Sequence, residues 1–199
     1  MCALILEFLV TLNFDMNREE ALNLIKKYIK NENLIKHSIA SGAVMKHLAL
    51  KLNEDKEKWE ITGILHDIDV ELTEGDIKTH THKAVEILKE NSIDEDIIEA
   101  VKMHNPLAWD RLSDKPYHIA LRAGETITGL IIATALVYPD KKLSSVKQES
   151  VLKRFKDKRF AAGADRNIIM ECEKLSIPLK DFIEISLNAM KEVACELGL

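Results

Sequence analysis

The sequence has few residues of the kinds that build disulfide-stabilised, fibrous or unstructured proteins. Its 199 residues include only 3 Cys, 7 Gly and 4 Pro. The cysteines, Cys2, Cys172 and Cys195, lie far apart and form no Cys-X-X-Cys motif, so neither a disulfide framework nor a thiolate zinc site is indicated. So few glycines and prolines exclude a collagen-like chain or a linker. We expect the reducing cytoplasm as the compartment.

Aromatic residues are also few, and the chain has no excess of basic charge. Phe, Trp and Tyr make up 5% of the chain, too little for the stacking surfaces that hold single-stranded nucleic acid. The 28 basic and 33 acidic residues give a net charge of −5, so we expect no binding to a polymeric nucleic acid. Residues 147–159 are a local exception, with six basic residues against two acidic ones. We interpret them as a solvated helical face or, alternatively, as a rim that attracts phosphate.

No apolar run is long enough to cross a membrane. The longest, residues 127–138, is shorter than the roughly 20 residues that a membrane-spanning helix needs. Arg122 and Glu125 come just before it, so a buried helix is predicted. Residues 1–15 are apolar but have no basic leader and contain Glu7, which argues against a signal peptide. We expect them to be an N-terminal extension that packs on the core or lies upstream of the true start at Met16.

Apolar residues at helical spacing dominate the rest of the chain, and no useful alternating pattern follows residue 15. Asn17 is placed to cap the first helix, Ser92 and Glu95 have the spacing of a capping box, and Pro178 and Gly198 suit a helix start and a helix end. The fold predicted is all-α, with one domain over residues 16–199. Its expected helices, about eight, cover residues 18–32, 34–52, 56–69, 80–90, 94–104, 117–138, 165–175 and 179–197.

Histidines and carboxylates recur near the ends of these predicted helices. His66 and Asp67 are adjacent where a helix is expected to end, and only near an end can neighbouring side chains reach one point. Imidazole nitrogen together with carboxylate oxygen favours a divalent ion such as Fe, Mn, Co or Zn. Taken alone, a His-Asp pair is better explained as a helix cap or a surface pair than as a metal site. His37, His80, His104 and Glu125 add to it.

With these residues in this order, the sequence resembles the HD-domain superfamily of metal-dependent phosphohydrolases, in particular its HDIG-type branch. The matching stretches run from about residue 20 to residue 199. They are KHSIASGAVMKHLA around His37, GILHDID at 63–69, HTHKAVEIL at 80–88, AVKMHN at 100–105, ETITGLIIATALVYP at 125–139 and SVLKRFKDKRFAAGADRNII at 150–169.

The resemblance implies a set of metal ligands. His37, His66, Asp67 and Glu125 would hold one divalent ion (Fe, Mn, Co, Zn or Mg). In branches with two ions, His80 and His104 would hold the second, with Asp67 bridging. The family usually has Asp where Glu125 stands, and the extra methylene moves the carboxylate by about 1 Å. Glu125 therefore ligates, binds through water, or pairs with a base. His82 is the alternative to His80.

The resemblance also implies hydrolysis of a small phosphorylated metabolite or nucleotide by metal-activated water. Asp67 and Arg122 are the candidate catalytic residues, Arg122 by holding a substrate phosphate; a structural Arg–Glu pair is the alternative. His118 is expected either behind the metal ligands or at the rim of the site, and His47 in solvent. Two other functions stay open: a non-catalytic module that binds metal or nucleotide, and a di-iron oxygenase.

Overall fold

The computed structural model describes residues 16–199, and this part of the chain contains helices and turns but no strand. The all-α prediction is confirmed for these residues, whereas the expected extension, residues 1–15, lies outside them. The α-helices are α1 (Arg18–Tyr28), α2 (Glu32–Leu52), α3 (Lys56–Leu65), α4 (His82–Glu90), α5 (Glu95–His104), α6 (Pro106–Trp109), α7 (Pro116–Leu136), α8 (Gln148–Lys156), α9 (Arg166–Met170), α10 (Leu179–Glu192) and α11 (Ala194–Leu197). The 3₁₀ helices are η1 (Leu143–Ser145) and η2 (Glu171–Leu175).

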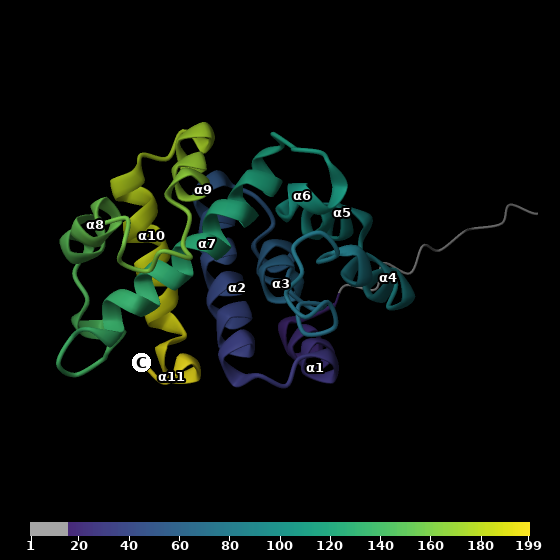
Figure 1. Cartoon of the computed structure of the whole chain (residues 1–199), viewed down its shortest axis with the longest axis horizontal. Coiled ribbons are helices and arrows are strands. Elements are labelled where there is room, and N and C mark those ends of the chain that lie inside the picture. Colours follow the sequence, from purple (N-terminus) through teal and green to yellow (C-terminus); the bar gives the residue numbers. More distant parts are fainter. Residues whose placement is uncertain (1–15) are drawn as a thin grey trace, which may run out of the picture.

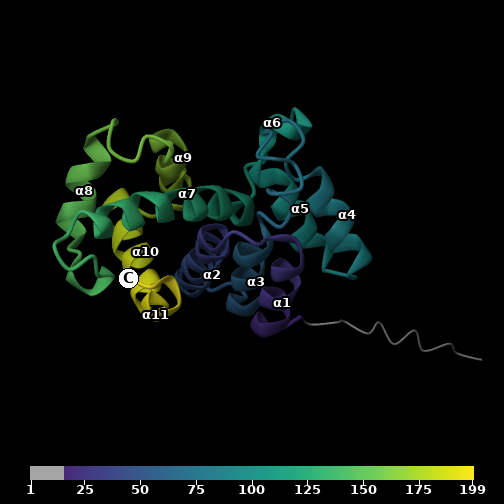
Figure 2. The same cartoon turned by 60° about the horizontal axis from the view of Figure 1, so that its bottom comes forward.

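The two longest of these helices, α2 and α7, cross at the centre of the molecule (Figures 1 and 2). Helices α1, α3, α4 and α5 lie on one side of the crossing, and α8, α9 and α10 lie on the other. The buried apolar side chains form two clusters that follow this division. The first core cluster is built mainly from α2, α7 and α10, and the second from α1, α3, α4 and α5.

Local capping explains several of the helix starts. Asn17 and Glu20 form a reciprocal capping box at α1, as the position of Asn17 predicted. The prediction for α5 was wrong: Asp94, not Ser92, is the cap, and its side chain accepts from the Asp96 amide. Ser92 has a φ of 55° in the left-handed turn that follows α4, so it lies too early to cap the next helix.

The helix ends near the histidines also differ from the prediction. Helix α3 ends at Leu65, with His66 as its C-cap, and tight turns occupy residues 66–81. His80 therefore lies in a turn, because α4 begins only at His82. There are more α-helices than the eight expected. Helix α6 forms in the predicted loop, α8 forms in the basic segment, and Val193 separates α11 from α10.

Helix α7 is apolar and long enough to pass a length and hydropathy test for a membrane span, but 67% of its most apolar window is buried within the protein. Its apolar side chains belong to the first core cluster. The expectation of a buried helix over this run is confirmed, and α7 is a core helix that several others pack against.

Helices α2 and α3 approach each other closely at two glycines. A Cβ atom added at Gly63 would lie 2.6 Å from the Ser41 carbonyl oxygen and 2.7 Å from the Gly42 Cα atom. Both neighbours are backbone atoms that cannot turn aside. The contact fixes the end of α3, and with it His66, against α2.

We therefore expect Gly63→Ala to lower the free energy of unfolding by about 1–3 kcal/mol, because the added methyl group overpacks a backbone contact. Urea unfolding measures the change. Gly129→Ala is the control, since a Cβ atom there meets nothing within 4 Å. Equal stability of the Gly63→Ala variant and the wild type would contradict a close helix contact.

Candidate metal centre

Four of the predicted ligands converge as two pairs of imidazole rings. His37 on α2 and His66 at the end of α3 approach to 3.2 Å between their Nε2 atoms. His80, in the turn before α4, and His104, the last residue of α5, approach to 3.1 Å between theirs. The two pairs adjoin, because the ring centroids of His66 and His104 are 5.1 Å apart. Residues separated by up to 67 positions thus share one site.

Asp67 lies between the two pairs, with one carboxylate oxygen toward each. Its Oδ2 atom is 3.4 Å from His66 Nε2 and 3.6 Å from His37 Nε2. Its Oδ1 atom is 3.0 Å from His80 Nε2 and 3.4 Å from His104 Nε2. The arrangement makes two half-sites that could each hold an ion. The first half-site is His37, His66 and Asp67, and the second is Asp67, His80 and His104.

Hydrogen bonds at the opposite ring nitrogens determine where the protons are. His66 Nδ1 lies 2.8 Å from the Gly63 carbonyl oxygen, and His104 Nδ1 lies 2.6 Å from that of Val101. Each carbonyl is in the last turn of its helix, where C=O groups have no intrahelical partner. A carbonyl only accepts, so both Nδ1 atoms carry the proton and a neutral ring presents its Nε2 lone pair inward.

The other two rings follow the same rule through side chains. His37 Nδ1 is 3.0 Å from the Thr128 hydroxyl, which donates its own proton to the Glu125 carbonyl and therefore accepts from the ring. His80 Nδ1 donates to the Asp69 carboxylate at 2.8 Å. All four rings thus direct the Nε2 atom toward the centre, where each presents a lone pair to a cation when its ring is neutral. The donor set fits divalent ions that accept imidazole and carboxylate ligands, such as Fe, Mn, Co and Zn.

The protonation of the cluster differs between the half-sites. Burial and then the charge of His66 lower the pKa of His37 to about 4. For His80 burial acts in the same direction, but hydrogen bonds to Asp67 and Asp69 outweigh it and raise the pKa to about 10. Burial also opposes ionisation of Asp67, yet His66 and the ring hydrogen bonds hold its pKa well below the usual range. An ion that binds at the second half-site must therefore displace a proton from His80.

Glu125 on α7 lies at the edge of the first half-site. Its Oε2 atom is 3.8 Å from His37 Nε2, and its Oε1 atom accepts a 2.5 Å hydrogen bond from Thr126. Burial raises the pKa of this carboxyl to about 7. Glu125 thus faces the cluster, but from farther away than the histidines and Asp67. That it ligates an ion stays a prediction.

Asp69 is a residue of the site that the sequence reasoning missed. Its side chain is fully buried, and beyond His80 it accepts hydrogen bonds from the Thr81 amide at 2.8 Å and the Ala84 amide at 3.0 Å. These two bonds cap the start of α4 in place of the N-cap residue Thr81, whose side chain makes no capping bond. The second aspartate of GILHDID was the available signal. Asp69 joins the end of α3, the second half-site and the start of α4.

Arg122 is fully buried, and its acidic partner is Glu171 rather than Glu125. The Nε atom donates to Glu171 at 2.7 Å, and Nη1 reaches the Met103 carbonyl at 3.5 Å. The Nη2 atom is buried and has no hydrogen-bond partner among the described residues. The structure thus contains an Arg–Glu pair and leaves one donor unused. Phosphate binding by Arg122 stays a prediction.

The remaining histidines lie outside the cluster. His82 stacks on Trp109 at 4.1 Å and binds the Ala108 carbonyl, so His80 rather than His82 is the residue brought to the cluster. His118 is buried and binds Ser113. His47 is not simply solvated, because α10 packs against α2 and places Glu192 3.0 Å from its Nε2 atom.

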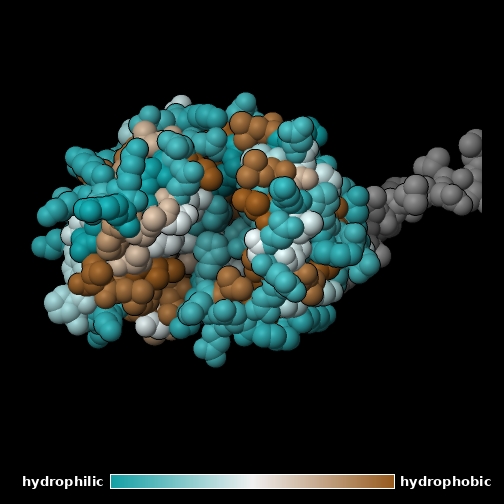
Figure 3. All heavy atoms as spheres, viewed as in Figure 1, coloured by the Kyte–Doolittle hydropathy of each residue, from teal (hydrophilic) through white to brown (hydrophobic). Residues whose placement is uncertain are grey.

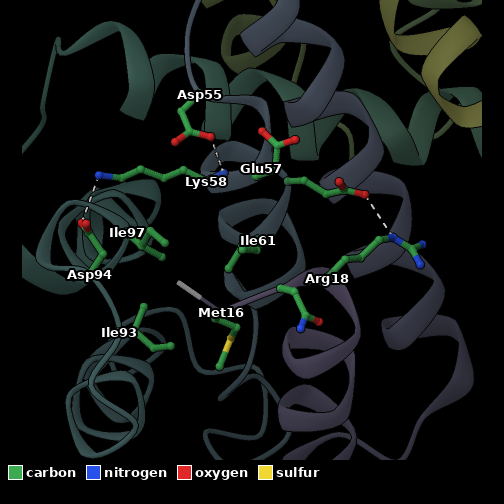
Figure 4. Close-up of a pocket in the computed structure, with 11 residues that line it drawn as sticks. Met16, Arg18, Asp55, Glu57, Lys58, Ile61, Ile93, Asp94 and Ile97 are labelled. Carbon is green, nitrogen blue, oxygen red and sulfur yellow. Dashed lines mark hydrogen bonds and ion pairs between the residues drawn. The ribbon is translucent and has the colours of Figure 1, made fainter. Parts of the chain in front are cut away.

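The cavities on the surface of the described residues include a larger and a smaller one near the helices that carry the cluster. A larger one, about 650 Å³, lies where α3 and α5 begin, with Ile61, Ile93 and Ile97 pointing into it (Figure 4). The cluster of predicted metal ligands lies at the opposite ends of the same two helices. A smaller cavity, about 270 Å³, includes His37 and Glu125 in its lining. A hydrophilic hollow also opens between the two sides of the molecule, in front of the region where α2, α3 and α7 meet (Figure 3).

We expect Asp69→Asn to empty the second half-site selectively. The amide of asparagine would donate to His80 Nδ1, which moves the ring proton to Nε2 and removes the lone pair that faces the ion. Affinity for the second ion should fall by about 10–100-fold, so the metal content after Zn²⁺ loading and dialysis should drop from about two ions per chain to about one.

The control is Asp76→Asn, the same change at an exposed aspartate of the same turn region, which should leave the metal content unchanged. If Asp69→Asn retains both ions and only lowers the melting temperature, Asp69 acts as a helix cap alone.

Comparison with known proteins agrees with the geometry. The family model described as HD domain matches residues 34–135, just over half of the chain, and this range holds all six predicted ligands. No solved structure matches the chain. The matched range begins within α2, passes through the turns that carry Asp67 and His80, and ends within α7. The chain belongs to the HD-domain family.

Proposed function

We propose that the protein is a divalent-metal-dependent phosphohydrolase that acts on a small phosphorylated metabolite or a nucleotide. The observation that carries the proposal is the position of Asp67, whose two carboxylate oxygens each face a different pair of inward-directed imidazole nitrogens. Membership of the HD-domain family supports it, because metal-dependent phosphohydrolases are typical of that family. Within the family we assign the chain to the HDIG-type branch on its GILHDID motif.

In the proposed reaction, the contribution of the protein is to hold and orient the metal ligands. The four Nδ1 hydrogen bonds fix each ring, so that ligands are in place before an ion or a substrate arrives. A divalent ion bound at such a site would lower the pKa of a bound water and stabilise negative charge on a phosphate. Four neutral histidines and two carboxylates against two divalent ions leave a net charge of about +2, which attracts a phosphate.

The charge distribution of the chain is compatible with a small anionic substrate. The basic segment, residues 147–159, includes α8, and Lys153, Lys156, Lys158 and Arg159 in it are exposed. The overall charge of −5 argues against a polymeric nucleic acid as the substrate. Cys172 and Cys195 are free thiols, which is compatible with the cytoplasm as the compartment we propose.

A second candidate function is a non-catalytic module that binds metal or a nucleotide. The observation in its favour is Glu125, which replaces the usual aspartate and lies 3.8 Å from His37. Such a module would bind ligand without forming product. A di-iron oxygenase, the third alternative, would retain iron and consume oxygen during turnover.

We expect Asp67→Ala to abolish both metal binding and hydrolysis, because one carboxylate serves both half-sites. The assay is release of inorganic phosphate from a panel of phosphomonoesters and nucleotides with added Mn, Co, Fe or Mg, alongside elemental analysis of the metal content. Asp76→Ala in the same turn region serves as control. Activity that persists in Asp67→Ala would rule out the proposed hydrolase.

We expect Arg122→Lys to raise KM with the metal content kept. Lysine retains a charge for Glu171 but lacks the guanidinium donors, including the unused Nη2, that a phosphate could engage. Glu171→Gln is the comparison, since it weakens the pair and keeps the arginine. An unchanged KM together with a lower melting temperature in Arg122→Lys would make the pair purely structural, and loss of metal would refute a role in phosphate binding.

A further inference from the structure

The smaller cavity lies between the cluster of predicted metal ligands and a segment of the chain that contributes none of those ligands. At one end of its lining are His37 and Glu125 of the first half-site. The rest of the lining comes from α7 and from the segment that leads into α9, and consists of Thr126, Gly129, Gly163, Ala164, Asp165 and Ile168. The cavity is therefore bounded both by residues of the cluster and by the loop before α9.

The loop that forms the far wall is held by one arginine. The guanidinium of Arg166 is shared among backbone carbonyls on both arms of this loop, which are those of Arg154, Phe155, Asp157, Phe160, Ala161 and Ala164. A charged donor that satisfies so many acceptors fixes the path of the backbone. The wall that carries Gly163 and Asp165 is therefore preformed.

Two glycines of the lining are not explained by packing or by backbone conformation. Gly129 is inside α7, where alanine is the better helix former. A Cβ atom added at Gly129 or at Gly163 would meet no atom within 4 Å. Neither residue has a positive φ, in contrast to Gly75 and Gly198. What the two glycines share is the cavity, whose space a side chain at either position would reduce.

The chemistry of the lining indicates which part of a substrate it would contact. Asp165 is negatively charged and exposed, so it would repel a phosphate and accept hydrogen bonds from hydroxyl groups. The hydroxyl of Thr126 donates to Glu125 and retains acceptor capacity. Ile168 adds a half-buried apolar surface. At about 270 Å³, the cavity is smaller than the pockets of about 300–1,000 Å³ that bind drug-sized ligands.

We propose that this cavity binds the alcohol part of a small phosphomonoester, meaning the hydroxyl-rich group that is esterified to phosphate, as in a sugar phosphate. Gly129 and Gly163 keep the cavity open. The phosphate then lies at the metal end, and the alcohol group lies against the loop that Arg166 holds. This inference rests on the proposed function and names the substrate class of the same site.

The test is Gly129→Ala, assayed with glycerol phosphate, ribose 5-phosphate and adenosine monophosphate, which carry alcohol groups of increasing size. KM should rise by about tenfold for the larger esters, because a methyl group takes space in the cavity. The melting temperature should rise by about 2–4 °C from the better helix former, and the metal content should not change. Ala133→Gly, one turn further along α7, is the matched control, with a lower melting temperature and an unchanged KM.

The outcomes separate this inference from the proposed function. Turnover by the wild type with every KM unchanged in Gly129→Ala overturns the cavity assignment and leaves hydrolysis standing. If the wild type hydrolyses none of the esters, the proposed function fails. Calorimetric titration of the same esters into Zn²⁺-loaded protein then decides: weaker binding by Gly129→Ala than by the wild type supports the cavity, and equal binding or none overturns it.

Discussion

The convergence of four imidazole Nε2 atoms on the one carboxylate of Asp67 is the constraint on which the rest of the site depends. Each ring is oriented by the hydrogen bond at its other nitrogen, and two of the four acceptors are carbonyls that the ends of α3 and α5 leave without helical partners. Ending a helix at a histidine thus provides both the ligand and the group that orients it. Asp67 supplies the negative charge between the pairs, and bound cations would complete the balance.

Helix α7 determines how the rest of the protein reaches this cluster. One stretch of it carries Glu125 at the first half-site, Thr128 behind His37 and Gly129 in the adjoining cavity. Arg122, one turn earlier, ties the same helix to η2 through Glu171. Because α7 is buried against both sides of the molecule, these groups hold fixed positions relative to one another, as preorganised sites require.

The sequence was informative where local signals decide the structure. The cap at Asn17, the buried run in α7 and the position of His66 close to a helix end follow from nearby residues and agree with the structure, although α3 ends four residues earlier than predicted. The partners that orient the cluster could not be predicted in this way. Thr128 is 91 residues from His37, and Glu171 is 49 residues from Arg122. Such pairs depend on how helices cross, which spacing along the chain does not specify. The predicted cap of α5 was wrong for a local reason, because Ser92 occupies a left-handed turn.

The ligands also belong to different halves of the core. His37 and Glu125 are on helices of the first core cluster, whereas His80 and His104 adjoin helices of the second. Ions held between them would act as cross-links that only the folded chain can form. Binding to the folded state alone shifts the folding equilibrium by mass action. The free energy of unfolding of this protein would then rise with the free concentration of the ion that it binds.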